Sequence, residues 1–288
     1  MKRFTYYSFR FLVFIFAIIP FRCLYFFSWL MFLIVYHFVG YRKKIVLENL
    51  RNSFPGKTEK EIKKISRGFY FHIADVVIES MKAFTMTEKA VCKRYRFLNA
   101  DFLDDIYRRN QSVLCVAGHF NNWEWGGIAT GTQVLHKPVG FYQPLSNKYI
   151  DNYIQHSRVQ GRSVLASVMN TSATFQKDWE EPVIYYMVAD QSPSSPRLAY
   201  WVKFLNQDTA TLHGPEKYAR IYNFPVVYAD VQKVKRGYYT VEFKMLCENP
   251  AQTKTGEITG KFMQMLEQKI IENPQFYLWS HRRWKLKR

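Results

Sequence analysis

The sequence predicts an α/β protein with a mixed, mainly parallel sheet flanked by helices and an N-terminal membrane-embedded helical segment. Short apolar runs alternate with helical stretches through most of the 288 residues, a pattern typical of strands joined by helices. Residues 9–40 are almost wholly apolar. No repeat or low-complexity linker divides the remainder. We therefore expect an anchor with a basic flank, residues 1–44, followed by one domain, residues 45–288.

The N-terminal segment is expected to be broken into two helices. Cys23 to Gly40 forms an 18-residue run without formal charge, close to the length needed to span a bilayer. Pro20 and Arg22 interrupt the apolar stretch, which favours an interfacial piece, Phe9 to Ile19, and then a spanning or re-entrant helix. Basic residues flank the run on either side, so the positive-inside rule leaves its orientation open. The alternative is a single buried core helix.

After this segment, Thr58 and Glu61 have the spacing of a capping box and predict a long amphipathic helix that continues to about Met81. Strands are expected at Val113–Ala117, Val139–Tyr142, Val183–Val188, Val226–Val231 and Tyr239–Phe243. Ligands bind outside the carboxyl ends of strands in such sheets. His119 follows one strand and Asp190 follows another, so we expect the two to open onto the same edge.

Composition indicates acidic partners. The formal net charge is +18 and aromatic residues make up 18% of the chain, so anionic lipids, phosphorylated glycolipids, acidic proteins or nucleic acid would be attracted. The basic residues form no evident nucleic-acid-binding motif, and no nucleic-acid partner is expected. The four cysteines are isolated, so they indicate neither a disulfide framework nor a zinc site, and no metal is expected.

The most informative stretch is GHFNNWEW, residues 118–125, directly after an apolar strand-like run. His119 precedes Glu124 by five positions, which is too far for neighbours on one helix face. We therefore place the histidine in a turn and the glutamate in the first turn of the next helix. Such a pair can act as a general base and its orienting carboxylate. The alternative is a backbone-bonded histidine beside an ordinary helix-start glutamate.

This stretch resembles the H-x-x-N-W-E motif of the lipid A biosynthesis (late) acyltransferases, a family of the lysophospholipid acyltransferase superfamily with its H-x4-D/E mark. Residues 42–55 resemble the family's basic R-x-x-V-x-x-N-L-x-x-x-F-P segment. Residues 141–158 resemble its Y-R-P block, residues 188–193 its P-D-Q/H-D block, and residues 276–285 its terminal Y-x-W-x-H-R-R-[FW]-K block. On these ordered blocks the chain is identified as a member of the family, which implies a glycerolipid acyltransferase-like fold.

The resemblance implies roles for five residues. His119 would be the general base and Glu124 its orienting partner. Asn122 matches the motif's asparagine, which is expected to shape the turn and is counted among the substrate-binding residues. Arg158 would bind a phosphate or steady charge on the thioester oxygen; the alternative is a solvated surface arginine. Asp190 would orient Arg158 or a substrate hydroxyl, or else serve as an ordinary cap.

The sequence departs from the family pattern at two places. Gln143 stands where the family has the arginine of Y-R-P, and Ser192 stands where it has a second acid. These departures bear on the identity of the acceptor more than on the type of reaction. The terminal aromatic and basic cluster, residues 279–285, suits a membrane interface and would also suit single-stranded nucleic acid. A packing or interface role is expected for its His281, not a second catalytic one.

The resemblance implies an inner-membrane O-acyltransferase with its catalytic domain on the cytoplasmic face. Acyl carrier protein would supply the acyl thioester, a lipid A precursor would be the glycolipid acceptor, and anionic membrane lipids would be further partners. The thioester is a co-substrate, so no cofactor is expected. Two alternatives stay open: an acyltransferase of the same family that uses another glycolipid or an amino-acid lipid, and a non-catalytic basic protein that binds membranes or nucleic acid.

Overall fold

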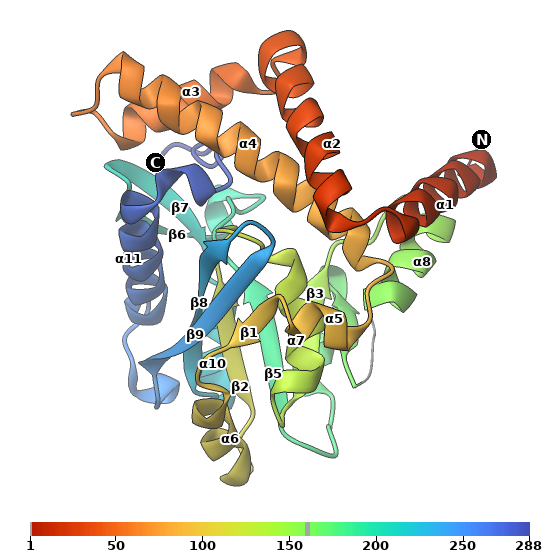
Figure 1. The fold of residues 1–288 in the computed structure, drawn as a ribbon. Helices are drawn as coiled ribbons and strands as arrows, with labels where there is room; N and C mark the ends of the chain where they lie inside the picture. Colours follow the sequence, from red (N-terminus) through yellow and green to blue (C-terminus); the bar gives the residue numbers. More distant parts are fainter. Residues whose placement is uncertain (1, 159–161) are drawn as a thin grey trace.

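The protein is an α/β structure built around one mixed sheet. The computed structural model describes residues 2–158 and 162–288, and within them the main sheet has seven strands in the order β1-β9-β8-β2-β5-β3-β4. Neighbouring strands are parallel except β8 and β9, which form an antiparallel pair. The predicted mixed, mainly parallel sheet is therefore confirmed, and Figure 1 shows it at the centre of the molecule with helices around it.

The five predicted strands are present, some of them longer than expected. They are β2 (Val113–Ala117), β3 (Lys137–Tyr142), β5 (Val183–Val188), β8 (Val226–Lys235) and β9 (Tyr238–Cys247). Four further strands were not predicted: β1 (Tyr95–Phe97), β4 (Val164–Ser167) and the antiparallel pair β6 (Ala199–Phe204) and β7 (Gln207–Leu212).

Strand β2 lies at the middle of the sheet and is buried on its two faces. Leu114 and Val116 join the hydrophobic cluster that includes residues of α9, α10 and α11. Cys115 and Ala117 join the cluster that includes residues of α5, α6 and α7. A strand covered on two faces reads as a continuous apolar run instead of an alternating one, as this strand does.

Helices cover the sheet on its two faces and extend beyond it. On one side lie α5 (Glu88–Cys92), α6 (Ala100–Arg108) and α7 (Glu124–Gln133); the other side has α9 (Thr171–Gln176), α10 (Gly214–Tyr222) and α11 (Glu257–Glu272). The remaining helices are α1 (Lys2–Ile18), α2 (Phe21–Leu33), α3 (Lys43–Ser53), α4 (Glu59–Ala83) and α8 (Lys148–Arg158).

The long helix α4 begins as the sequence predicts. The Thr58 side chain accepts from the Glu61 backbone N–H, and the Glu61 carboxylate accepts from the Thr58 backbone N–H at 2.8 Å. This capping box satisfies donors that the first helical turn leaves without partners. The helix runs to Ala83 and carries several polar residues on its buried side, among them Asp75 and Glu79.

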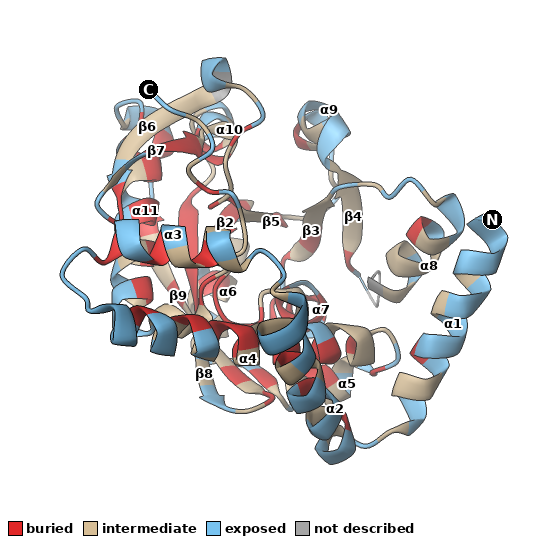
Figure 2. Ribbon diagram, turned by 90° about the horizontal axis from the view of Figure 1, so that it is seen from above, coloured by how far each residue is buried: buried red, intermediate tan, exposed pale blue. Residues whose placement is uncertain are grey.

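The N-terminal segment is broken at Pro20, as predicted. Helix α1 ends at Ile18, and α2 continues through a π-helical turn, Ile34–Val39, to a left-handed Gly40. Phe21–Val39 is long and apolar enough to span a membrane, and 17% of the residues in its most apolar 18-residue stretch are buried. One side of α2 nevertheless packs on α4, and Figure 2 shows that the outer surface of α1 and α2 is mostly exposed. The domain boundary after residue 44 stays a prediction.

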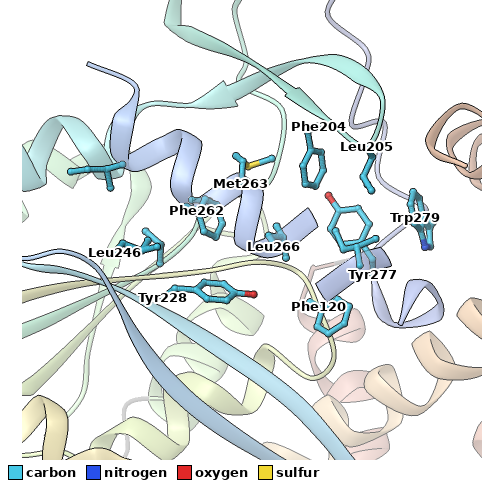
Figure 3. Packing of buried hydrophobic residues seen from close by; sticks show 14 of the residues in the cluster. Phe120, Phe204, Leu205, Tyr228, Leu246, Phe262, Met263, Leu266, Tyr277 and Trp279 are labelled. Carbon is cyan, nitrogen blue, oxygen red and sulfur yellow. The ribbon is translucent and has the colours of Figure 1, made fainter. Parts of the chain in front are cut away.

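The C-terminal segment returns to the turn that follows β2. Tyr277 forms an isolated antiparallel bridge with Phe120, and Figure 3 shows these two residues beside Leu266 of α11. Trp279 is fully buried and its indole donates to the Pro274 carbonyl. Trp279 therefore packs inside the protein and does not lie at a membrane interface.

Candidate active site

The two parallel strands β2 and β5 bring His119 and Asp190 together. Ala117 is paired in register with Val188 at the ends of these strands, so the residues two positions beyond each end leave the sheet at the same edge. There the Nδ1 atom of His119 lies 2.6 Å from the Oδ1 atom of Asp190. The predicted shared edge is confirmed, although the sequence analysis did not pair these two side chains.

The turn between β2 and α7 is held in a specific shape. Asn121 has a left-handed backbone with φ of 57°, a conformation that asparagine tolerates better than most residues. Its backbone N–H donates to the Phe276 carbonyl at 3.0 Å, and its side chain donates to the Val231 carbonyl at 2.8 Å. The Leu278 N–H donates to the His119 carbonyl. Neighbouring segments therefore fix the backbone on either side of the histidine.

Gly118 is the one position of this turn where a side chain has no room. A Cβ atom there would lie 2.6 Å from a terminal carbon of Leu266. Helix α11 packs directly against this turn through Leu266, and a side chain at residue 118 would require that leucine to shift.

The contacts of His119 favour one tautomer when the Gln191 amide nitrogen faces the ring. Asp190 is 2% exposed and accepts from the protonated Nδ1 atom. The side-chain amide nitrogen of Gln191 lies 3.1 Å from Nε2. Because an amide nitrogen only donates, Nε2 is the acceptor in this pair. The ring therefore carries its lone pair on Nε2, the nitrogen that a general base would use.

Charges around the pair favour its ionised form. Burial alone would lower the pKa of His119, but the charge and hydrogen bond of Asp190, with the charge of Glu124, outweigh burial and raise it above its ordinary value. Burial alone would raise the pKa of Asp190, but His119 and the nearby charge of Arg283 outweigh burial and lower it. The imidazolium that proton transfer creates is therefore stabilised by a carboxylate that stays ionised.

Glu124 lies where it was predicted, at the first residue of α7. Its carboxylate accepts from the indole of Trp123, and that indole packs at an angle against the His119 ring with centroids 5.0 Å apart. Glu124 and His119 line the same cavity. The contact with Nδ1 belongs to Asp190, so in this geometry Glu124 acts on His119 by charge and through Trp123. Its catalytic role stays a prediction.

Asn122 is fully buried, with both ends of its amide bonded inside the protein. The nitrogen donates to Glu79 Oε2 at 2.7 Å, and the oxygen accepts from the Trp125 N–H at 3.2 Å. The geometry therefore gives Asn122 the expected turn-shaping role. A direct contact with substrate is a prediction that this geometry does not support, because the amide would have to leave two partners.

The cavity beside His119 has a volume of about 570 Å³. Its lining combines the polar groups of the turn with a long apolar wall from β3, β4, β5 and α7; the apolar members include Ile128, Phe141, Leu165, Met187 and Val188. A few polar groups at one end of an apolar cavity are typical of sites for amphipathic ligands. Arg158 is the last residue of α8, but its side chain lies outside the described part of the structure, and its predicted role is untested.

Two further residues at the site were not predicted to act there. Arg283 is 1% exposed and its Nη1 atom donates to the Ala210 carbonyl, while its charge lowers the pKa of Asp190. His281 accepts from the Ser192 N–H at 3.3 Å, and burial lowers its pKa to about 4, so it is a neutral acceptor. The sequence pointed to these two residues only through the terminal H-R-R block. The charges of that block are also what a solvent-exposed interface would carry, so they did not indicate a buried role.

Within residues 2–158 and 162–288, no group of three or more His, Cys, Asp or Glu side chains is arranged to hold a metal ion. The four cysteines are free thiols. Burial raises the pKa of the Cys115 thiol well above its ordinary value, so Cys115, which lies inside β2, is a core residue.

A protein with this sheet, this histidine–carboxylate turn and this apolar cavity matches one family along almost its whole length. The family model of the bacterial lipid A biosynthesis acyltransferases matches residues 1–286. The chain belongs to this family, and membership supports a transferase that acts in lipid A synthesis with a glycolipid as acceptor. The recognition of the family from its ordered blocks is confirmed.

Individual relatives are similar at low identity. The chain is 24% identical over 252 residues to a lipid A biosynthesis lauroyltransferase of Escherichia coli (strain K12), a match that covers 86% of the chain and 80% of the relative. It is 21% identical over 257 residues, with the same coverage, to a palmitoleoyltransferase of the same strain. A lipid A biosynthesis acyltransferase of Haemophilus influenzae is 22% identical over 247 residues, 85% of the chain and 78% of the relative. The two Escherichia coli names specify different acyl groups, so similarity alone does not assign a chain length.

Proposed function

We propose that the protein transfers a fatty acyl group from acyl carrier protein to a hydroxyl of a lipid A precursor, with His119 as the general base. The observation that carries this proposal is the 2.6 Å contact between His119 Nδ1 and Asp190, which leaves Nε2 as an acceptor beside the cavity. Family membership supports the acyl transfer and the glycolipid acceptor.

The reaction balances without a cofactor. His119 Nε2 removes the proton of the acceptor hydroxyl as the oxygen attacks the thioester carbonyl. Asp190 stabilises the imidazolium that forms. When the tetrahedral intermediate collapses, the carbon–sulfur bond breaks, and the leaving thiolate of the carrier takes the proton from Nε2. The products are the acyl ester and the free thiol of the carrier. The acceptor hydroxyl would take the place of the Gln191 amide at Nε2.

Glu124 would serve this reaction as a second negative charge at the base. It lines the cavity with His119, and its charge acts with that of Asp190 on the imidazole pKa. Asp190 therefore orients the imidazole ring, while the charge of Glu124 helps His119 accept a proton from the substrate hydroxyl. Arg158, at the end of α8, is proposed to contact the anionic part of the donor or acceptor.

The acyl chain would occupy the apolar part of the cavity. A volume of about 570 Å³ lies within the usual range of small-molecule sites, about 300–1,000 Å³. Acyl carrier protein as donor is supported by charge, because an acidic carrier would be attracted to a chain with a formal net charge of +18.

We place the protein at the inner membrane, with the catalytic domain on the cytoplasmic face. Large apolar side chains are exposed along α1, α2 and the π-helical turn that follows α2, including Phe4, Phe11, Phe14, Phe26 and Phe38. Such side chains are favourable in lipid and costly in water. Helix α2 with its π-helical extension would enter the bilayer, and α1 would lie along its surface.

Anionic lipids are proposed partners beside α2. A hollow of about 710 Å³ between α2, α4 and the end of α11 is lined by the aromatic residues Trp29 and Phe71 and by the cations Lys57, Lys64 and Arg67. Two acids also line it, but Glu61 is held in the capping box and Glu272 pairs with Lys269. Aromatic rings beside cations suit the headgroup layer, where phosphates are found.

This lipid contact is testable with a charge-matched control. Glutamine at Lys57, Lys64 and Arg67 should reduce binding to vesicles that contain phosphatidylglycerol. Glutamine at the exposed Lys60, Lys63 and Lys89, which do not line the hollow, should reduce it less. Equal losses in the two triple variants would mean that net charge alone drives binding.

The transfer reaction is tested with purified protein in mixed micelles. Acyl carrier protein loaded with a fatty acyl thioester and a lipid A precursor should give free carrier thiol and a glycolipid heavier by one acyl group in mass spectra. Arms with another glycolipid and with an amino-acid lipid separate the alternative acceptors. Release of thiol only with one of those acceptors would reassign the substrate, and no release with any acceptor would contradict catalysis.

A further inference from the structure

A buried carboxylate outside the histidine site joins the N-terminal helix to the catalytic turn. Glu79 of α4 is fully buried. Its Oε1 atom accepts from the Tyr25 hydroxyl of α2 at 2.8 Å. Its Oε2 atom accepts from the Asn122 amide at 2.7 Å and from the Tyr239 hydroxyl of β9 at 2.9 Å. One side chain therefore connects helix α2, the sheet and the turn that carries His119.

The contact with Asn122 extends to Glu124. The Asn122 oxygen accepts from the Trp125 N–H near the start of α7, and the Trp125 indole donates to the Glu79 backbone carbonyl at 3.1 Å. The first turn of α7, which begins at Glu124, is therefore held from two sides by Glu79. Displacing this carboxylate would release Asn122 and, through it, the Trp125 N–H, while the indole contact to the Glu79 carbonyl would remain.

A second carboxylate of α4, that of Asp75, also bonds to α2. Asp75 lies one helical turn before Glu79 and accepts from the Ser28 hydroxyl of α2 at 2.6 Å. Arg236, from the β8–β9 connection, binds Asp75 through Nε and Nη2, and its Nη2 also donates to the Tyr25 carbonyl at 3.1 Å. Helix α2 is thus seated by directional bonds as well as by apolar contact.

The electrostatics show why this arrangement is sensitive. The three side chains that bond to the Glu79 carboxylate are neutral donors, and burial raises the pKa of Glu79. A buried charge without a directly bonded cation is costly unless every oxygen is satisfied. Loss of any one donor, for example through displacement of α2 and Tyr25, therefore disturbs the whole network.

We propose that Glu79 is a positioning residue for acyl transfer and that, with Tyr25, it couples the seating of α2 to the geometry of the His119 turn. The proposal rests on the transfer reaction proposed above. Phe21–Val39 is the candidate membrane span. In this proposal the turn is correctly shaped only when that helix lies against α4, since Tyr25 then bonds to Glu79. The membrane segment is then part of the catalytic machinery and more than an anchor.

The test is a double-mutant cycle on kcat. Tyr25→Phe removes one hydroxyl and keeps the ring, and Glu79→Gln removes the charge at constant size. Each should lower kcat, because a misplacement of about 1 Å at a reacting group costs about a hundredfold in rate. KM for the thioester should stay within about threefold, since the substrate contacts are kept. The losses should be non-additive, since the two residues share one network. Tyr7→Phe on the exposed surface of α1 is the control and should leave kcat unchanged.

Hydrogen exchange of the amides of residues 119–125 gives a readout that does not need substrate. Tyr25→Phe should speed this exchange, and Tyr7→Phe should not. If Glu79→Gln fails to fold, Tyr25→Phe alone still decides the matter. Wild-type kcat and unchanged exchange in Tyr25→Phe would overturn the coupling, as would losses that simply multiply. A wild-type protein with no transfer activity would contradict the proposed function instead, while the exchange result would still judge the coupling.

Discussion

Asparagine at position 190 is the most informative single change at the proposed base. Asp190 is buried and its Oδ1 atom lies 2.6 Å from His119 Nδ1. Asp190→Asn keeps the size of the side chain but removes its charge. An amide nitrogen turned toward Nδ1 would donate to the ring and place the ring proton on Nε2. The histidine would then present a donor to the substrate hydroxyl and could not remove its proton.

The magnitude follows from the lost charge. The charge centres of a hydrogen-bonded carboxylate and imidazolium lie about 4 Å apart, and at an effective dielectric constant of about 20 they attract by about 4 kcal/mol. Each 1.4 kcal/mol or so is about tenfold in rate. We therefore expect kcat/KM to fall by about a thousandfold, with the remaining activity supported by the charge of Glu124.

The pH profile checks the same reasoning. His119 is a base only when Nε2 is unprotonated, so kcat/KM should rise with pH through the pKa of His119, which lies above its ordinary value. In Asp190→Asn this acid limb should move to lower pH, because the charge that raises the pKa is gone. Asp208→Asn, which alters an exposed ion pair with Lys203, is the control. A loss below tenfold with an unmoved acid limb would refute the role given to Asp190.

Three further predictions concern the turn, its packing and the membrane. Glu124→Gln should lower kcat/KM by about a hundredfold, within the range for groups that assist proton transfer; a twofold loss would make Glu124 only a helix-start residue. Gly118→Ala should destabilise the protein by about 1–3 kcal/mol through overpacking, and Leu266→Ala in the same chain should recover part of the melting temperature; no recovery would contradict the close contact. Deleting residues 1–19 should leave binding to anionic vesicles that weakens as salt rises; complete loss of binding at low salt would contradict a basic interfacial surface.

The sheet was predictable because its central strands are short apolar runs. Residues 113–117 and 183–188 are continuously apolar, as expected for strands covered on two faces. The edge strands β1 and β4 are three and four residues long, too short for a pattern to be distinguished. The β6–β7 pair lies outside the main sheet. Strand β7 is mostly polar, whereas β6 is mainly apolar up to Lys203 and could have been recognised from its sequence.

The sequence predicted where the site lies, but not which side chains contact each other there. Strand order follows from the fold, and the adjacency of β2 and β5 decides that Asp190 contacts His119. The motif suggested Glu124 for this contact because the two residues are close in sequence. Glu79 and Arg283 could not be found, because burial distinguishes them and a single charged residue in a helix or a basic tail reads as solvated.

The most direct test of the proposed mechanism is single-turnover acyl transfer by His119→Ala. We predict a loss of about a hundred- to ten-thousandfold, the usual contribution of a general base, with unchanged membrane recovery and melting temperature. His156→Ala, an exposed histidine on α8, should retain wild-type turnover. Near-wild-type transfer by His119→Ala would contradict the proposed mechanism, because no other described side chain in the cavity combines an acceptor nitrogen with a buried carboxylate partner.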